Sequence, residues 1–289
     1  MKVLIYLPVY NDQFRISRAI ESIVSQTFTN WDLVISDNCS TDKTLAEIQY
    51  YLKDPRISCI THQTHLSGDV NFNNIENFIS NESEHELTSI IASDDYWGDE
   101  YYLENLVGAF LKNSKEGRIK LALPIFSTIP NIDTGESKLV KIKAGNSLYI
   151  LRVIQLFKSW STVNLIYGLY SKEFFLDLLN TKFSRLTKSN AYTDWWWAYL
   201  VLKKTSPLFC CKSIYFKDQY KYEIQKEISR IENFILTIKF TPDFFKGKLS
   251  LIRFNNFHDL LLIFIFAISK TTLGLLHTFR RTLKRIFKV

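Results

Sequence analysis

Residues 88 to 97 read Thr-Ser-Ile-Ile-Ala-Ser-Asp-Asp-Tyr-Trp, an apolar run that ends in two adjacent carboxylates and then in aromatic residues. A short run of β-favouring residues is typical of a buried strand, and open α/β sheets bind ligands just beyond the carboxyl ends of their strands. Asp94 and Asp95 therefore lie where a ligand site is expected. Because two ionised neighbouring carboxylates repel each other, a bound divalent cation would stabilise the pair. The pattern also fits a solvated turn with an Asp that caps a helix from Asp99.

The rest of the chain alternates short apolar runs with segments of helical periodicity. This alternation predicts an α/β domain with a mostly parallel sheet flanked by helices, in which successive strands end in loops at one edge. A helix after the second strand is expected to be capped by Ser40 or Thr41. The expected strands are 3–7, 31–35, 57–61, 119–129 and one within 162–170, and the other expected helices are 15–28, 71–80, 99–112 and 172–179.

The net charge of +7 is concentrated at one end of the chain. Residues 270–289 carry six Lys or Arg side chains and no acid, which leaves the first 269 residues at +1. A basic excess confined to an apolar terminus indicates an anionic membrane surface as partner, and it argues against nucleic acid.

The apolar run in this tail covers residues 260–268, which is well short of the ~20 residues that a membrane span needs. After it, Leu276, Phe279 and Leu283 fall on one helical face, with basic residues on the other. We therefore expect residues 257–289 to lie in the membrane interface, with packing on a partner and a true span as the alternatives.

The four cysteines show no metal-type spacing, and Cys210 and Cys211 are adjacent, which favours a reducing compartment. Met1 and Lys2 run directly into an apolar strand without a cleavage site, so we expect no signal peptide. Together with the basic tail, this predicts a cytoplasmic protein on the inner face of the cell membrane.

Four motifs in the first hundred residues resemble glycosyltransferase family 2, whose enzymes have a GT-A type fold. Each motif is weak alone, but their order and spacing match the family, and looser similarity extends to about residue 205. The motifs are Pro8-Val9-Tyr10-Asn11, Ala19-Ile20-Glu21-Ser22-Ile23 with Gln26-Thr27-Phe28, Trp31 with Asp37-Asn38-Cys39-Ser40-Thr41-Asp42, and Asp94-Asp95-Tyr96-Trp97.

The resemblance implies a nucleotide-sugar site at the ends of the first two strands. Pro8, Val9 and Tyr10 would line the nucleotide pocket together with Asn11 and Asn38, and Asp37 would accept a hydrogen bond from the nucleobase. Without the resemblance, Asp37 is an ordinary turn residue and Tyr10 a core aromatic.

The acidic pair resembles the Asp-X-Asp region of the family, with Asp94 as the leading ligand for Mn²⁺ or Mg²⁺ and for the sugar diphosphate, and Asp95 as the second metal ligand. The first acid of the family motif is replaced by Ala92, so its ribose contact has no counterpart here.

Asp194 stands directly before Trp195 and matches the general base of the family, although it could equally cap a helix over 195–203. The preceding acid of the family pattern is Thr193 here. Asn164, Trp97 and Trp195 are further candidates for the acceptor side.

The resulting hypothesis is an inverting, metal-dependent glycosyltransferase of polysaccharide biosynthesis. It would move a sugar from a nucleotide sugar, a UDP-sugar first, to a glycan or lipid-linked oligosaccharide. Residues 1–100 would form the nucleotide half, 101–220 the acceptor half, and 221–289 the helical membrane extension. A catalytically silent membrane scaffold and a sugar nucleotidyltransferase remain alternatives, although the second typically has a Gly-rich basic loop where this chain has Tyr10-Asn11-Asp12-Gln13.

Overall fold

The computed structural model describes the N-terminal part of the chain most fully, and all of its described residues fall in one compact unit formed by residues 1–184 and 188–223. The described residues are 1–66, 75, 78–80, 84–114, 121–130, 137–141, 165–180, 197, 201, 204–205 and 208–216. The basic tail therefore lies outside them. Among the helices that are described, none is both long and apolar enough to cross a membrane.

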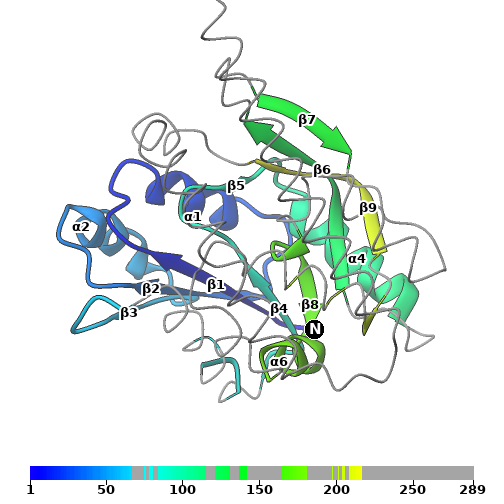
Figure 1. Cartoon of the computed structure of the whole chain (residues 1–289), viewed down its shortest axis with the longest axis horizontal. Coiled ribbons are helices and arrows are strands. Elements are labelled where there is room, and N and C mark those ends of the chain that lie inside the picture. The colour runs from blue at the N-terminus through cyan, green and yellow to red at the C-terminus, as the bar shows by residue number, and fades with distance from the viewer. Residues whose placement is uncertain are drawn as a thin grey trace, which may run out of the picture. The chain divides into compact units, whose positions relative to one another are not determined.

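Nine strands of the described residues form one mixed sheet in the order β3-β2-β1-β4-β8-β6-β9-β5, with β7 paired to β6 (Figure 1). The half that residues 1–90 supply is parallel, as the sequence predicts, since β1 pairs with β2 and β4, and β2 with β3. Its strands are β1 (Val3–Val9), β2 (Trp31–Asp37), β3 (Ile57–Thr61) and β4 (Leu87–Ile90).

The other half of the sheet mixes both strand directions. β8 runs antiparallel to β4 and to β6, and β5 antiparallel to β9, while β6 and β9 are parallel. β6 and β7 pair antiparallel. These strands are β5 (Tyr96–Trp97), β6 (Leu121–Pro130), β7 (Ser137–Lys141), β8 (Leu169–Ser171) and β9 (Leu208–Phe216).

The helices follow the predicted segments closely. The helix expected over 172–179 has those bounds, and Ser171 caps it by accepting a hydrogen bond from the Phe174 backbone N–H. Within the segment expected as helix 71–80, only residues 75 and 78–80 are described, and all four are helical. The helices are α1 (Ile16–Val24), α2 (Thr44–Gln49), a single 3-10 turn η1 (Tyr51–Lys53), α4 (Tyr102–Ser114) and α6 (Lys172–Leu179).

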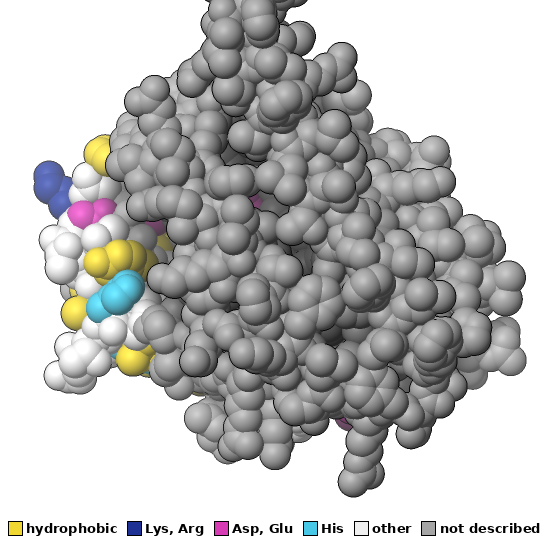
Figure 2. Space-filling model, in the orientation of Figure 1, with side chains coloured by type: hydrophobic (Ala, Val, Ile, Leu, Met, Phe, Trp, Pro, Cys, Tyr) yellow, Lys and Arg dark blue, Asp and Glu magenta, His cyan; other side chains and the backbone are white. Residues whose placement is uncertain are grey.

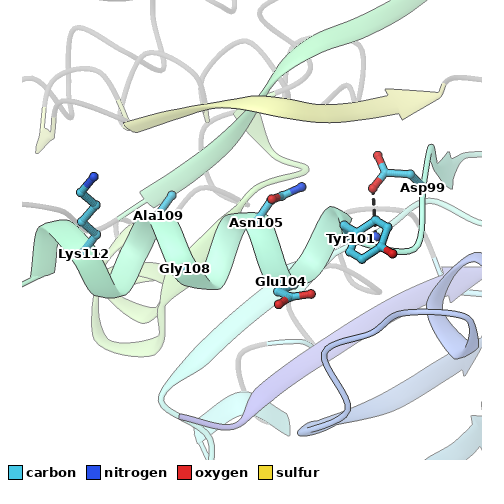
Figure 3. A pocket seen from close by; sticks show the side chains of 7 residues that line it. All are labelled: Asp99, Tyr101, Glu104, Asn105, Gly108, Ala109 and Lys112. Carbon is cyan, nitrogen blue, oxygen red and sulfur yellow. Dashed lines mark hydrogen bonds between the residues drawn. The ribbon is translucent and has the colours of Figure 1, made fainter.

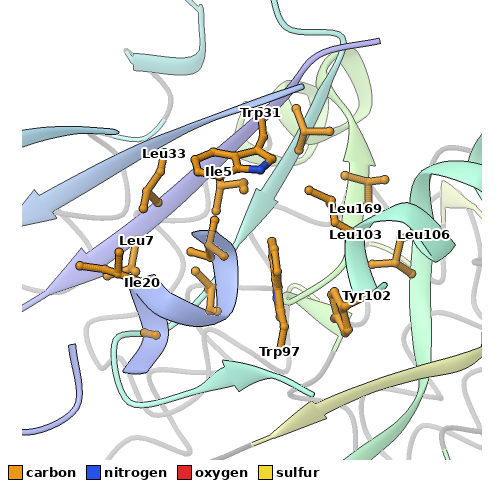
Figure 4. Packing of buried hydrophobic residues seen from close by; sticks show 14 of the residues in the cluster. Ile5, Leu7, Ile20, Trp31, Leu33, Trp97, Tyr102, Leu103, Leu106 and Leu169 are labelled. Carbon is orange, nitrogen blue, oxygen red and sulfur yellow. The ribbon is translucent and has the colours of Figure 1, made fainter. Parts of the chain in front are cut away.

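The core lies between the sheet and the helices α1 and α4, where Ile5 and Leu33 of the strands face Ile20 and Leu103 of the helices (Figure 4). These side chains are fully buried, so the hydrophobic effect stabilises the sheet edge that carries the strand-end loops.

Gln26, from the second sequence motif, joins the two helices that cover this core. Its amide donates to the carbonyls of Ser22 and Asp99, both at 2.8 Å, and its oxygen accepts from the Leu103 backbone N–H at 2.8 Å. One side chain thus satisfies backbone groups at the end of α1 and at the start of α4, which fixes the segment between β4 and α4.

Candidate active site

Loops that follow β1, β2 and β4 emerge at one edge of the sheet. The parallel register pairs Val9 with Asp37, the last residues of β1 and β2, whereas β4 ends at Ile90 opposite Tyr6, so the chain leaves β4 before it reaches the level of Val9. The side chains also make contact, since the Ser93 hydroxyl donates to Asp12 Oδ2 at 2.6 Å. β1 lies between β2 and β4, so Asp37 and Asp94 follow strands that are next but one to each other in the sheet.

Asp37 is completely buried at the end of β2. Its Oδ2 accepts a hydrogen bond from the Ser40 backbone N–H at 3.1 Å, whereas its Oδ1 has no hydrogen-bond partner among the described residues. A buried carboxylate oxygen without a donor is unfavourable, because burial removes the water that would otherwise solvate it. The arrangement suits a ligand that brings an N–H or O–H group to this oxygen.

Two asparagines brace the loops around Asp37. Asn11 adopts a left-handed backbone (φ 48°), accepts the Thr41 backbone N–H at 2.8 Å, and donates its own backbone N–H to the Ser40 hydroxyl at 2.9 Å. Asn38 exchanges two hydrogen bonds of 2.8 Å with the backbone of Leu66. The hydrogen bonds of Asn11 and Asn38 therefore fix the backbone of the loops near Asp37.

The expected capping of α2 by Ser40 or Thr41 is therefore wrong. Both residues are engaged with Asn11, and the helix begins later, at Thr44. Asp42 accepts hydrogen bonds from the Thr44 backbone N–H and hydroxyl instead. Burial works against the charge of Asp42, but these bonds and one from the Gln13 N–H together lower its pKa.

Tyr10 is a surface aromatic and not a core residue, since 42% of it is exposed. Its ring lies 4.2 Å from the ring of His65, centroid to centroid, at 48°. On the face that Figure 2 draws, histidine and hydrophobic side chains lie next to one another. Such a pair offers an aromatic surface on which a planar base could stack.

The turn formed by residues 93–95, named the acidic turn here, gives its two carboxylates different surroundings. Asp95 is buried, and its Oδ2 accepts the Tyr215 hydroxyl of β9 at 2.9 Å. Asp94 is half-buried, and Arg18 donates to its backbone carbonyl at 3.4 Å while stacking over the Tyr96 ring at 4.5 Å. Asp94 is therefore the more accessible carboxylate.

Tyr215 stays protonated in this environment. Burial raises its pKa well above the ordinary value, and the charge of Asp95 raises it further. The hydroxyl is consequently a dependable donor to Asp95.

The donor set at this edge fits a Mg²⁺ or Mn²⁺ ion that takes few protein ligands. Among the described residues, no group of three His, Cys, Asp or Glu side chains could enclose a metal. Such ions commonly bind to one or two carboxylates and complete their shell with water and substrate phosphates. Asp94 can supply such a carboxylate, whereas one oxygen of Asp95 is already held by Tyr215.

Residues 4–119 match the family model described as glycosyl transferase family 2. This part of the chain belongs to that family. The match spans β1 to α4 and so covers the three loops that meet at the candidate site.

Curated relatives of this family match over limited stretches. The glucosyltransferase WfgD of Escherichia coli, named for transfer from UDP-Glc to α-D-GlcNAc-diphosphoundecaprenol, is 30% identical over 112 residues, which is 39% of this chain and 42% of that protein. The first two relatives are matched over only 23% of their own length. The chain therefore spans less than half of the curated relatives it matches first.

Solved structures of family members share the fold. S. aureus TarS 1–349 in complex with UDP-GlcNAc superposes with a TM-score of 0.53 at 17% identity, over 89% of this chain and 75% of that one. The mannosyltransferase PcManGT from Pyrobaculum calidifontis, solved with GDP-Man and Mn²⁺, gives 0.51 at 14% identity, over 96% and 74%. At these identities the likeness establishes the GT-A architecture.

Several family positions proposed from the sequence lie outside the described residues: Asp194, Asn164 and Trp195. Trp97 is described, and it is a core residue that is 3% exposed and stacked on Tyr102 at 4.9 Å. The structure thus gives an acceptor-side role of Trp97 no support. Gly98 follows it because a side chain there would meet the Ile214 carbonyl of β9 at 2.8 Å.

Sequence reasoning missed Asp12, a buried carboxylate within the first family motif region. Arg15 binds its Oδ1 through Nε at 2.6 Å and Nη2 at 2.5 Å, and Ser93 binds its Oδ2. The local Asp-X-X-Arg spacing at a helix start was an available signal for the first contact, but nothing in the sequence indicates the second.

A separate cavity of about 770 Å³ follows one side of α4, where Asn105, Ala109 and Lys112 point the same way (Figure 3). The described residues that line it include none of those expected at the nucleotide or metal site of the family. They are Asp99, Tyr101, Glu104, Asn105, Gly108, Ala109 and Lys112.

Proposed function

We propose that the chain is an inverting glycosyltransferase that moves a sugar from a nucleoside diphosphate sugar to an acceptor hydroxyl. The observation that carries this proposal is the buried Asp37 Oδ1, which has no partner among the described residues and lies at the same sheet edge as Asp94. The end of β2 offers Asp37 as a hydrogen-bond acceptor for the nucleobase. The loop after β4, which is the next strand but one in the sheet, offers Asp94 as a carboxylate for the metal-bound diphosphate.

The ligands named for the fold neighbours and relatives support this proposal. TarS was solved with UDP-GlcNAc and PcManGT with GDP-Man and Mn²⁺, and WfgD is named for UDP-Glc. We infer a UDP-sugar as the first donor to test, with Mn²⁺ or Mg²⁺ as cofactor. A bound divalent cation would supply positive charge to the departing diphosphate.

Each residue of the proposed site would have its own role in binding or catalysis. Asp37 would accept from the nucleobase, Tyr10 and His65 would stack against it, and Asp94 would hold the metal. For the acceptor, the proposed base is Asp194, which would take the proton from the attacking hydroxyl so that the new bond forms on the face opposite the leaving group. Only the first four side chains belong to the described residues.

The acceptor is proposed to be a glycan or lipid-linked oligosaccharide at the inner face of the membrane. The relative WfgD acts on a diphosphoundecaprenol-linked sugar by its name, and the tail of this chain combines six basic residues with apolar ones. Lys and Arg near an anionic membrane contribute roughly 1 kcal/mol each to binding. Residues 257–289 would thereby bring the cleft to its lipid-linked substrate.

A donor panel tests the proposal. Purified full chain is incubated with UDP-, GDP-, dTDP- and CMP-sugars, with Mn²⁺, with Mg²⁺ or with EDTA, and release of the free nucleotide is measured. We expect slow, metal-dependent hydrolysis of one donor class.

The alternatives give different results in the same panel. A sugar nucleotidyltransferase would make a nucleotide sugar and pyrophosphate from a sugar phosphate and a nucleoside triphosphate. A silent scaffold would neither bind nor hydrolyse any donor, and that result would refute the proposed function.

A further inference from the structure

We propose that Asp12 and Tyr215 are positioning residues that hold the acidic turn from two sides and so preset Asp94 for a metal-bound diphosphate. This inference rests on the proposed function, since it concerns how the same site is organised. Neither residue was expected at the site from the sequence.

The first hold comes from the loop after β1. Asp12 is 3% exposed, and each of its carboxylate oxygens receives a protein donor, with Ser93 on Oδ2 and Arg15 on Oδ1. Its backbone N–H donates to the Thr44 hydroxyl at 2.8 Å. A buried carboxylate bound in this way is neutralised by Arg15 and has its oxygens engaged, so it is suited to fixing Ser93 and not to binding a ligand.

The second hold comes from β9, more than a hundred residues further along the chain. The Tyr215 hydroxyl donates to Asp95 Oδ2 at 2.9 Å, and the Tyr215 ring is fully buried and stacked on Tyr167 at 4.9 Å. β9 also pairs with β5 directly after the turn, with Tyr215 opposite Trp97. The tyrosine is thus anchored by its own strand before it holds Asp95.

Asp94 stands between these two fixed neighbours. Ser93 is bonded to the loop after β1 and Asp95 to β9, so the backbone that carries Asp94 has little freedom to turn its carboxylate away. A ligating group that is held by surrounding hydrogen bonds binds its metal more tightly, because less ordering remains for the binding step. Loss of either hold should therefore weaken the metal-dependent part of nucleotide binding and leave the metal-independent part intact.

Calorimetric titration of the full chain separates the two parts. UDP and GDP are titrated in EDTA and then in Mn²⁺, and the ratio of the two dissociation constants gives the metal effect. In Ser93→Ala and in Tyr215→Phe, each of which removes one hydroxyl, we expect that ratio to fall about tenfold, as for a lost hydrogen bond to a charged group. Binding in EDTA should stay within about twofold of the wild type, because the contact to Asp37 is unchanged.

Asp32→Asn is the matched control. Asp32 lies at the opposite end of β2, where it binds Lys2 at 2.5 Å and His85 at 2.7 Å, so its loss perturbs the fold without touching the acidic turn. The control should keep the wild-type metal effect. Thermal unfolding of each variant shows whether the fold is retained, and Asp12→Asn serves as a third variant if either hydroxyl deletion fails to fold.

The outcomes of these titrations distinguish failure of the positioning role from failure of the proposed function. A full metal effect in Ser93→Ala and Tyr215→Phe, or an equal loss of binding in EDTA, would overturn the positioning role alone. A wild-type chain that binds neither UDP nor GDP would overturn the proposed function, and the positioning role with it.

Discussion

The strongest test of the site is Asp37→Asn. The substitution keeps the size of the side chain, and the amide oxygen can still accept the Ser40 N–H that now binds Oδ2 at 3.1 Å. The amide NH₂ then takes the place of Oδ1, the oxygen that has no partner within the described chain, and a donor from the nucleobase would meet another donor.

The expected size of the effect follows from the burial of this oxygen. A hydrogen bond to a charged group contributes about 1.5–3 kcal/mol when both partners are desolvated. Its loss should therefore weaken UDP binding by roughly 10- to 150-fold. The free energy of unfolding should change by about 1 kcal/mol or less, since the protein hydrogen bond to Ser40 is retained.

Titration calorimetry in EDTA measures this effect without the contribution of the metal. Asp32→Asn is again the control, because it changes a carboxylate of the same strand at the other end, and it should bind UDP as the wild type does. A dissociation constant for UDP in Asp37→Asn within about twofold of the wild-type value would refute the reasoning that Oδ1 accepts a hydrogen bond from the nucleobase.

Three further predictions concern other parts of the chain. Asp194→Asn should abolish sugar transfer while UDP binding stays nearly intact, and undiminished turnover in a transfer assay would exclude its role as general base. Deletion of residues 270–289 should move the protein from the membrane pellet to the supernatant on fractionation, and unchanged partitioning would exclude the anchor. Asp54→Asn should lower stability at neutral pH but not in acid, as followed by urea unfolding from pH 7 to 3. The hydrogen bonds from Arg56 lower the pKa of Asp54 in the folded state. Ionised Asp54 therefore stabilises the fold at pH values above its unfolded-state pKa of about 3.9, and this stabilisation disappears as the pH falls through the lower pKa of the folded state. A stability difference between Asp54→Asn and the wild type that persists in acid would contradict this.

Much of the fold was predictable because it depends on local patterns. The apolar runs at residues 3–7 and 57–61 became β1 and β3, and the segment 172–179 became α6 with the expected bounds. Parallel pairing of the first strands also followed, since alternating strands and helices bring the strand ends to one edge. Asp94 was proposed as a site residue for that reason, whereas Asp37 was proposed through the family resemblance.

The roles of individual side chains at that edge were harder to predict. Asn11 is expected in the nucleotide pocket, and the sequence did not predict its hydrogen bonds to Ser40 and Thr41. Trp97 follows an acidic pair and yet packs in the core. Asn11 bonds to residues 29 and 30 positions away, and Trp97 pairs with Tyr215 of β9 as well as stacking on nearby Tyr102. The local pattern does not contain the distant partners.

The sequence by itself determined the family, the order of the early elements and the sheet edge at which the chemistry is expected, because each of these depends on residues close together in the chain. Only the tertiary structure decided that Asp12 binds Ser93 and that Tyr215 binds Asp95, contacts that span 81 and 120 residues. The two carboxylates of the acidic turn are adjacent and chemically alike, but Asp95 is buried and accepts a hydrogen bond from β9, whereas Asp94 is half-buried. Burial and hydrogen bonding are set by the residues that pack against a side chain, and for Asp95 one of these comes from β9, a strand that is distant in the sequence.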